Sequence, residues 1–182
     1  MSHVLVLRAA DFAASRHREQ RRKDARGSPY INHPLRVAHL LAQVGGVADA
    51  QVLAAALLHD TVEDTATSLD EIAQCFGARV RDLVAEVSDD RGLNAAQRKQ
   101  AQIAHAPALS ADAVLIKLGD KISNIRDIID SPPQGWSLVR RRAYLDWAEA
   151  VIDACPRSSP ELEALFRVTL REARDALRED AT

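Results

Sequence analysis

Hydrophobic residues recur at helical spacing along almost the whole chain, and this periodicity constrains the fold more than any other feature. Aromatic residues make up only 4% of the chain while Ala and Leu are abundant, so little of it favours β-strands. We therefore expect an all-α, single-domain helical bundle spanning residues 1–182. The expected helices run from about Val4 to Gln20, Pro34 to Val44, Asp49 to Val62, Leu69 to Phe76, Ala78 to Ser88, Ala95 to Ala104, Ala111 to Ile129, Ser137 to Ala154 and Glu161 to Arg178.

Composition supports one folded unit of ordinary polarity. With 182 residues, of which 47% are hydrophobic and 27% charged, the chain can bury one sizeable core. No stretch approaches the roughly 20 apolar residues of a membrane span, and the segment 1–10 does not resemble a signal peptide. We therefore expect a cytoplasmic protein with no membrane partner. A net charge of −2 and a pI near 6.3 argue against nucleic acid as a partner.

A dense group of acid–base side chains follows an apolar helical stretch in the first half of the chain. Residues 50–58 are nearly all Ala, Val and Leu, which is typical of a buried helix, and the charged residues come directly after them. On a helix, residues four apart share a face, so His59 aligns with Glu63 and Asp60 with Asp64. Charges at the end of a buried helix need a partner, and a divalent cation is one. The alternative is a helix end at which His59 caps carbonyl groups and the acids reach solvent.

Two other segments supply side chains of the same kind. His33 immediately precedes Pro34, which favours the first turn of a helix, so we expect His33 at a helix entrance. Asp120 follows a mostly apolar run, with Asn124 one turn later on the same face. Two imidazoles and two carboxylates without a thiolate permit Mn, Fe, Co, Ni or Zn. The candidate ligands are His33, His59, Asp60 and Asp120, and their wide separation means that helix packing must assemble the site.

Taken in order, these motifs resemble the hydrolase domain of the RelA/SpoT alarmone enzymes, within the HD superfamily. The likeness rests on the segment 27–34, which ends in His33-Pro34, and on the run 59–65. It is closest to the stand-alone small alarmone hydrolases, such as the metazoan SpoT homologue. The resemblance implies a single HD-type helical bundle, because the chain has no room for the synthetase and regulatory domains of the long family members. Further matching segments are 17–24, 67–71, 87–90 and 135–147.

The resemblance implies a role for each matching residue. The family typically uses Mn²⁺, although another divalent ion is possible. Spacing alone does not decide which of the neighbouring acids Glu63 and Asp64 is the general base. Gly119 departs from the alanine usual in the family, and glycine inside a helix costs about 1 kcal/mol relative to alanine, so we expect a slightly softer backbone with the site retained. By resemblance, the metal ligands are His33, His59, Asp60 and Asp120, the water-activating or water-orienting pair is Glu63 and Asp64, and the substrate contacts are Arg22 and Lys23 near the base, Asn124 near the ribose, and Tyr144 in the pocket.

The implied reaction is hydrolysis of guanosine 3′,5′-bis(diphosphate), ppGpp, to GDP and pyrophosphate; pppGpp is a related substrate. The chemistry agrees with the residues, because a metal lowers the pKa of bound water and a nearby carboxylate can take the proton. The metal site does not encode the base, so an NADPH 2′-phosphatase or another nucleotide phosphohydrolase is the alternative. A non-catalytic nucleotide sensor would lack a ligand or an acid, and none is missing here. The sequence leaves the oligomeric state open.

Basic and aromatic residues outside these motifs are harder to interpret. Guanidinium groups suit phosphate, and they cluster at 16–26 and at 140–142. Charge runs are usually solvated helix faces, so we expect most of them at the surface, apart from Arg22 and Lys23. We expect Trp136, Tyr144 and Trp147 to pack in the core along the penultimate helix in preference to forming a base-stacking platform, with Tyr144 a pocket residue by resemblance only.

Overall fold

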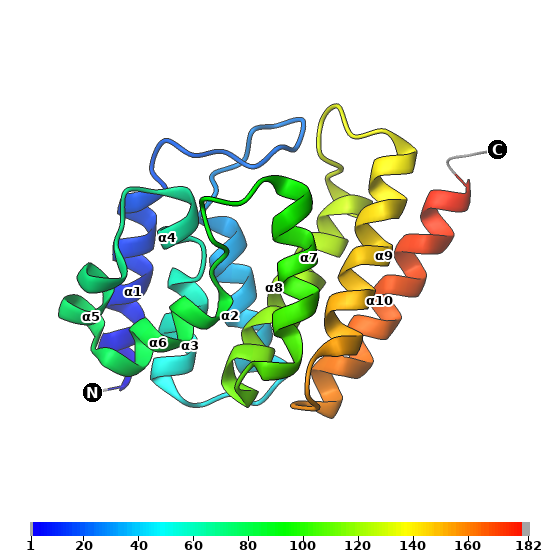
Figure 1. The fold of residues 1–182 in the computed structure, drawn as a ribbon. Helices are drawn as coiled ribbons and strands as arrows, with labels where there is room; N and C mark the ends of the chain where they lie inside the picture. The colour runs from blue at the N-terminus through cyan, green and yellow to red at the C-terminus, as the bar shows by residue number, and fades with distance from the viewer. Residues whose placement is uncertain (1, 180–182) are drawn as a thin grey trace.

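The structure is a computed structural model that describes residues 2–179, and within that range it contains helices and no β-strand. An isolated bridge joins Arg21 and Pro29. The prediction of an all-α fold is thus confirmed (Figure 1). The helices are α1 (Ser2–Arg16), α2 (Asn32–Gln43), α3 (Ala50–Leu58), α4 (Thr61–Asp64), α5 (Leu69–Phe76), α6 (Ala78–Val87), α7 (Ala95–His105), the 3₁₀ turn η1 (Ala106–Ala108), α8 (Ala111–Asp130), α9 (Leu138–Ala154) and α10 (Pro160–Glu179).

The apolar side chains form two buried clusters that meet at α2 and α8. The first cluster lies among α1, α3, α5 and α6, where the short side chains of Ala54, Ala55 and Ala56 are fully buried. The second lies among α8, α9 and α10, with α8 in the middle of the molecule and α9 and α10 side by side at one side of it (Figure 1). Helix α2 contributes Leu41 to the first cluster and Leu40 to the second. Helices α2 and α8 therefore form the boundary between the two clusters.

The predicted helix Asp49 to Val62 is wrong as a single element, because it is divided into α3 and α4. Two side chains take carbonyl groups that a continuous helix would need. Thr61 Oγ1 donates to the carbonyl of Leu58 at 2.6 Å, and His59 Nδ1 lies 2.8 Å from the carbonyl of Ala56. Such side-chain bonds compete with the helical ladder and end it. His59 and Asp60 consequently lie at a break between helices.

The predicted first helix also ends early, at Arg16 instead of Gln20. Residues 17–20 form a turn closed by a hydrogen bond from Gln20 N to the carbonyl of His17 at 3.0 Å. The chain then runs across the end of the bundle as an irregular segment before α2 begins at Asn32. This segment passes beside the site described below.

The start of α5 agrees with the sequence, since Ser68 Oγ accepts the N–H of Glu71 at 3.1 Å. The Glu71 side chain forms an ion pair with Arg16.

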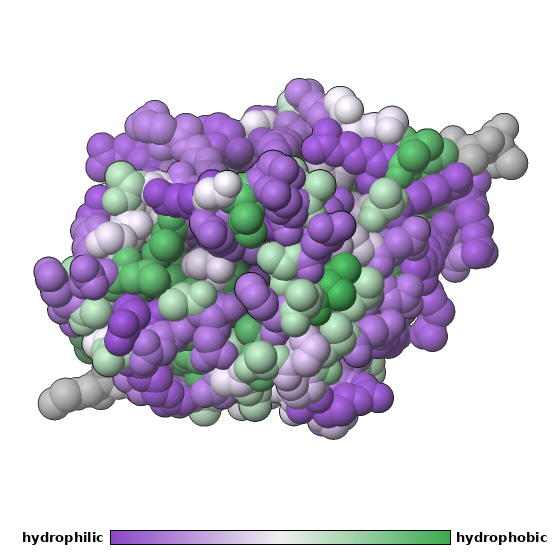
Figure 2. All heavy atoms as spheres, viewed as in Figure 1, coloured by the Kyte–Doolittle hydropathy of each residue, from purple (hydrophilic) through white to green (hydrophobic). Residues whose placement is uncertain are grey.

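Among residues 2–179, no helix is both long enough and apolar enough to cross a membrane. Figure 2 shows one face of the molecule, on which hydrophilic residues prevail and apolar residues form small separate patches.

Candidate metal and nucleotide site

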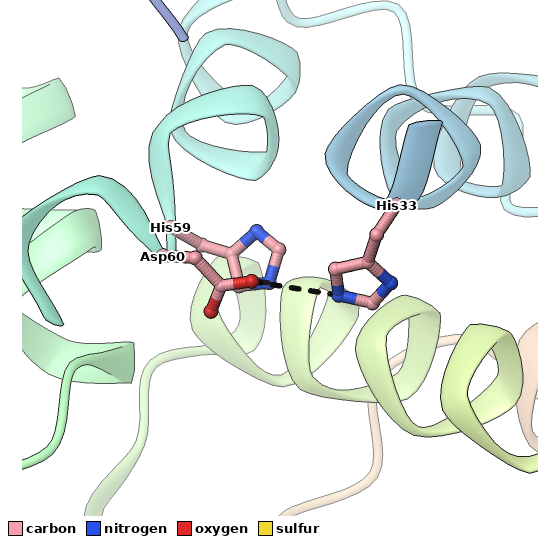
Figure 3. Close-up of side chains that lie close together, drawn as sticks. All are labelled: His33, His59 and Asp60. Carbon is pink, nitrogen blue, oxygen red and sulfur yellow. Dashed lines mark ion pairs between the residues drawn. The ribbon is translucent and has the colours of Figure 1, made fainter. Parts of the chain in front are cut away.

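The predicted metal ligands come together at the boundary between the two core clusters. His33 lies in the first turn of α2, His59 and Asp60 at the break between α3 and α4, and Asp120 in the middle of α8. Ligand atoms of His33, His59 and Asp60 all lie within 4.8 Å of one another (Figure 3). Asp120 Oδ1 lies 3.2 Å from His33 Nε2 and 3.9 Å from His59 Nε2. The packing of three chain segments therefore places two imidazoles and two carboxylates around one point.

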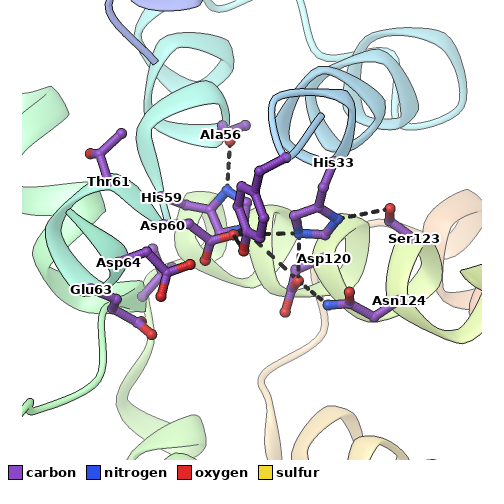
Figure 4. A network of polar contacts seen from close by, with 12 residues as sticks. His33, Ala56, His59, Asp60, Thr61, Glu63, Asp64, Asp120, Ser123 and Asn124 are labelled. Atoms are coloured by element: carbon purple, nitrogen blue, oxygen red, sulfur yellow. Dashed lines mark hydrogen bonds and ion pairs between the residues drawn. The ribbon is translucent and has the colours of Figure 1, made fainter. Parts of the chain in front are cut away.

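Both imidazoles are held through the nitrogen that faces away from this cluster. His59 Nδ1 donates to the carbonyl of Ala56, and His33 Nδ1 lies 3.1 Å from Ser123 Oγ (Figure 4). The buried Nε2 of His59 finds no hydrogen-bond partner among the described residues. This nitrogen points toward two carboxylates, 3.2 Å from Asp60 Oδ2 and 3.9 Å from Asp120 Oδ1, while Nδ1 is fixed by the backbone; this is the arrangement of a metal-binding imidazole. The residues present fit a divalent cation, and the capping alternative for His59 describes only its Nδ1.

The protonation of the cluster is set by its own charges. Burial alone raises the pKa of the Asp60 carboxyl, but the imidazoles of His59 and His33 outweigh burial and hold that pKa well below its usual range. Burial lowers the pKa of His59, but Asp60 and Asp120 outweigh it and raise the pKa to about 9. Without a cation, a proton on the His59 imidazole compensates the carboxylates. A divalent cation bound there would displace that proton.

Tyr30 is a residue of this site that the sequence did not predict. Its hydroxyl donates to Asp60 Oδ2 at 2.7 Å. Burial, followed by the charges of Asp60 and Asp64, raises the pKa of Tyr30 far above its ordinary value, so the phenol keeps its proton. It therefore acts as a fixed donor that orients Asp60. Its place in the motif just before His33 was the only sequence signal.

The two acids of α4 lie beside the cluster in different surroundings. Glu63 is partly buried, and its Oε1 accepts the N–H of Asp89 at 2.7 Å. Burial, followed by the charge of Asp60, raises the pKa of Glu63 to about 7. Asp64 is exposed, and its Oδ2 accepts a hydrogen bond from Gln20 Nε2 at 2.8 Å. Glu63 thus has the pKa suited to a general base near neutral pH.

A cavity of about 350 Å³ adjoins the cluster and is lined by all four predicted substrate contacts: Arg22, Lys23, Asn124 and Tyr144. Arg22 Nη2 donates to Asn124 Oδ1 at 2.9 Å and forms an ion pair with Asp127. Asn124 Nδ2 donates to Asp120 Oδ1 at 2.5 Å, as expected for residues one turn apart. Asn124 therefore connects the cavity to the group of four candidate metal ligands. Asp127 is a member of the site that the sequence did not predict.

The aromatic residues differ in part from the sequence expectation. Trp136 precedes α9 and lines the cavity, with its ring 5.8 Å from that of Tyr144. Trp147 packs against the second core cluster, as expected, but Lys121 Nζ also lies 4.2 Å from the centre of its ring. The prediction that Trp136 is a core residue is wrong, because its side chain is only half-buried and lines the cavity.

Two lysines buried beside the cluster were also not predicted. Lys121 Nζ lies 3.1 Å from Asp120 Oδ2, and Lys117 Nζ donates to the carbonyl of Val87 at 2.7 Å. Burial lowers the pKa of Lys117. For Lys121 burial acts in the same direction, but the charge of Asp120 outweighs it and raises the pKa. The positive charge of Lys121 stabilises the carboxylate form of Asp120.

Gly119 has a packing role in addition to the flexibility expected from the sequence. A Cβ at this position would lie 2.5 Å from Leu41 Cδ1 and 3.1 Å from Val37 Cγ1. The glycine therefore allows α8 to approach α2 closely, next to two of the predicted metal ligands.

The chain is similar to known proteins over most of its length. A family model described as HD domain matches residues 9–146. The human protein named guanosine-3′,5′-bis(diphosphate) 3′-pyrophosphohydrolase MESH1 is 51% identical over 162 residues, covering 89% of this chain and 90% of the human protein. The Xenopus tropicalis protein of that name is 50% identical over 160 residues, covering 88% of this chain and 89% of its own length. A solved structure described as a metazoan orthologue of SpoT that hydrolyses ppGpp and plays a role in starvation responses matches with a TM-score of 0.90 at 40% identity, over 92% of this chain and 94% of that one.

Proposed function

Because this chain belongs to the HD domain family, we propose that it hydrolyses ppGpp to GDP and pyrophosphate by breaking the bond between the 3′-oxygen of the ribose and the pyrophosphate group. One observation carries the proposal: across most of its length the chain is about half identical to proteins named for this reaction. The four candidate ligands, which converge beside a nucleotide-sized cavity, agree with it.

A divalent cation, held by His33, His59, Asp60 and Asp120, is part of the proposal. When bound, it supplies Lewis acidity that lowers the pKa of water and polarises a phosphoryl oxygen. We propose Mn²⁺ from the family resemblance, because the mixed nitrogen and oxygen ligands alone would also accept later transition metals. Tyr30 and Ser123 keep Asp60 and His33 in ligating orientations.

Glu63 is the proposed general base, and Asp64 the residue that orients the attacking water. Support for this division comes from their surroundings. With a pKa near 7, Glu63 is partly ionised at neutral pH and is basic enough to take a proton from water. Asp64 lines the cavity that adjoins the four candidate ligands, which supports a role beside the bound nucleotide.

Arg22, Lys23, Asn124 and Tyr144 are the proposed substrate contacts. Asp127 holds the guanidinium of Arg22, which lies 5.5 Å from the centre of the Tyr30 ring, so the side chain is ordered before a nucleotide binds. A group ordered in advance loses less entropy on binding. We place Arg22 and Lys23 near the base and Asn124 near the ribose, and we propose a cytoplasmic location, where this substrate would be met.

The direct test incubates metal-stripped protein with ppGpp, with and without Mn²⁺, and resolves the products. We expect GDP and pyrophosphate only with the metal, and loss of turnover in Asp60→Ala and Glu63→Ala variants. NADPH and other nucleotides, added as competing substrates, measure the preference for ppGpp. Absence of turnover with every divalent metal tried would overturn the proposal, as would a much faster reaction with NADPH.

A further inference from the structure

Two residues of the turn that follows α1 have no role so far: Gln20, which contacts the exposed acid Asp64, and His17, which contacts Gln20. We propose that Gln20 is a positioning residue for Asp64, and that His17 holds Gln20 in place. The inference rests on the proposed function, because it assigns these residues to the step in which Asp64 orients water.

The contacts form a continuous chain from the helix end to the acid. His17 is 2% exposed, and its Nδ1 lies 2.6 Å from Gln20 Oε1. Gln20 Nε2 in turn donates to Asp64 Oδ2 at 2.8 Å. The partners Gln20 and Asp64 are far apart in sequence and are brought together by the turn at 17–20, which replaces the last turn predicted for the first helix.

The carboxylate of Asp64, at the end of this chain of contacts, fixes the direction of each hydrogen bond in it. An ionised carboxylate only accepts, so Gln20 must present its NH₂ group to Asp64 and its carbonyl oxygen to His17. His17 must then carry a proton on Nδ1. Its Nε2 is buried and has no hydrogen-bond partner among the described residues, so the ring is fixed through Nδ1 and by packing. A single donor–acceptor order is therefore built into the chain.

The same turn also contacts Tyr30, the residue that orients the carboxylate of Asp60. The His17 ring lies 4.8 Å from the Tyr30 ring, and Tyr30 N donates to the carbonyl of Gln20 at 3.2 Å. The Tyr30 hydroxyl donates to Asp60, as described above. One short segment thus controls the orientation of both Asp60 and Asp64.

An exposed carboxylate needs such a partner if it is to orient water. Asp64 has solvent on one side, so without Gln20 its side chain would sample several rotamers. Positioning within a fraction of an ångström is what makes a catalytic group effective. Loss of the donor should therefore lower kcat much more than it raises KM.

The test compares Gln20→Ala and Gln20→Glu with a Glu19→Ala control from the same turn. Gln20→Glu keeps the volume of the side chain but replaces its donor by an acceptor. We expect kcat for ppGpp to fall about 10- to 100-fold in both Gln20 variants, with KM within about threefold and Mn²⁺ affinity unchanged. His17→Ala should show a smaller fall of the same kind, and Glu19→Ala none.

A double-mutant cycle with Asp64→Asn separates positioning from a structural role. If Gln20 acts through Asp64, Gln20→Ala should lower kcat less than threefold in the Asp64→Asn background. Equal effects of Gln20→Ala in the two backgrounds would overturn the inference, as would full activity of Gln20→Glu. Those outcomes leave the proposed function intact if the wild-type protein turns over ppGpp. No turnover by the wild-type protein would overturn the function, and the role of Gln20 with it.

Discussion

Glu63 and Asp64 are neighbours in sequence, yet one is a partly buried acid and the other an exposed one. Burial of Glu63 beside Asp60 has a cost in stability as well as the use in catalysis that we propose for it. Its pKa of about 7 in the folded protein lies above the ordinary value of 4.5, so the folded state holds the proton more tightly. The contribution of Glu63 to the free energy of unfolding therefore falls as pH rises from about 4.5 to 7.

We predict that Glu63→Gln makes the metal-free protein more stable at pH 8 while lowering kcat about 10²- to 10⁴-fold. The amide is neutral and can still accept the N–H of Asp89, so the cost of the buried charge disappears. After discounting for partial exposure, a gain of about 1–2 kcal/mol is expected. Thermal unfolding at pH 8 and pH 4.5 measures it. The two proteins should converge at the lower pH; a variant less stable at pH 8 would contradict the prediction.

Gly119 sets the distance between α8 and α2. We predict that Gly119→Ala destabilises the protein by about 1–2 kcal/mol, because the added methyl group contacts Leu41 and Val37, and this outweighs the better helix propensity of alanine. Chemical denaturation measures the change. In a Leu41→Ala background the same substitution should cost much less, since the space left by the shortened side chain at position 41 accepts the methyl group. An equal cost in both backgrounds would mean that close packing is not the cause.

At the scale of residues, the sequence predicted the members of the site that carry charge in a recognisable motif. His33, His59 and Asp60 are together, and Asp120 faces both imidazoles. The roles assigned to Glu63, Asp64 and the substrate contacts stay predictions. The residues that hold the site, such as Tyr30, Ser123 and Gln20, were missed. They act through single hydrogen bonds to partners distant in sequence, and neither residue spacing nor composition predicts such a bond.

At the scale of elements, periodicity predicted that helices exist more reliably than where they end. The division between α3 and α4 depends on hydrogen bonds from His59 and Thr61 that compete with the backbone. Local propensity does not show whether a threonine will make that bond. The break has a function in the geometry, since it directs His59 toward Asp120 while Glu63 faces Asp89.

Helix α7 is held to the rest of the protein mainly by polar contacts, since none of its residues is fully buried. Gln102 Nε2 donates to both carboxylate oxygens of Asp89 at 2.9 Å, and the Trp147 indole donates to the carbonyl of Lys99 at 3.1 Å. We predict that Gln102→Ala speeds amide hydrogen exchange across α7 about tenfold, with α8 unchanged. Exchange mass spectrometry measures this, with Gln100→Ala on the exposed side as control. Equal exchange in both variants would show that Gln102 does not anchor the helix.

At the scale of the whole molecule, the resemblance to HD-superfamily alarmone hydrolases is confirmed by the family match and by the relatives. Helical periodicity gave the fold class, but not the division into two clusters, because periodicity marks which face of a helix is buried and not what covers it. That residues 1–182 form one domain without synthetase or regulatory parts stays a prediction; residues 1 and 180–182 lie outside the described residues.

The four candidate metal ligands come from α2, the α3–α4 break and α8, so a bound cation should stabilise the whole fold. We predict that Mn²⁺ at 100 times its dissociation constant adds about 2.7 kcal/mol, which raises the unfolding temperature of a domain of this size by about 5–10 °C. Calorimetry of stripped and reloaded protein measures the shift. Asp120→Asn should abolish most of it, whereas Asp112→Asn, on the same helix but away from the site, should retain it. A full shift in Asp120→Asn would remove Asp120 from the ligand set.

The order of the ligands along the chain has a consequence for synthesis on the ribosome. Translation delivers His33, His59 and Asp60 early, but Asp120 belongs to α8, which closes the boundary between the two clusters. A nascent chain that stops before α8 lacks both the last carboxylate and the helix that carries it. Translation interrupted before α8 therefore yields a fragment in which the proposed cation site lacks one of its four ligands, and the complete site can assemble only after α8 has left the ribosome.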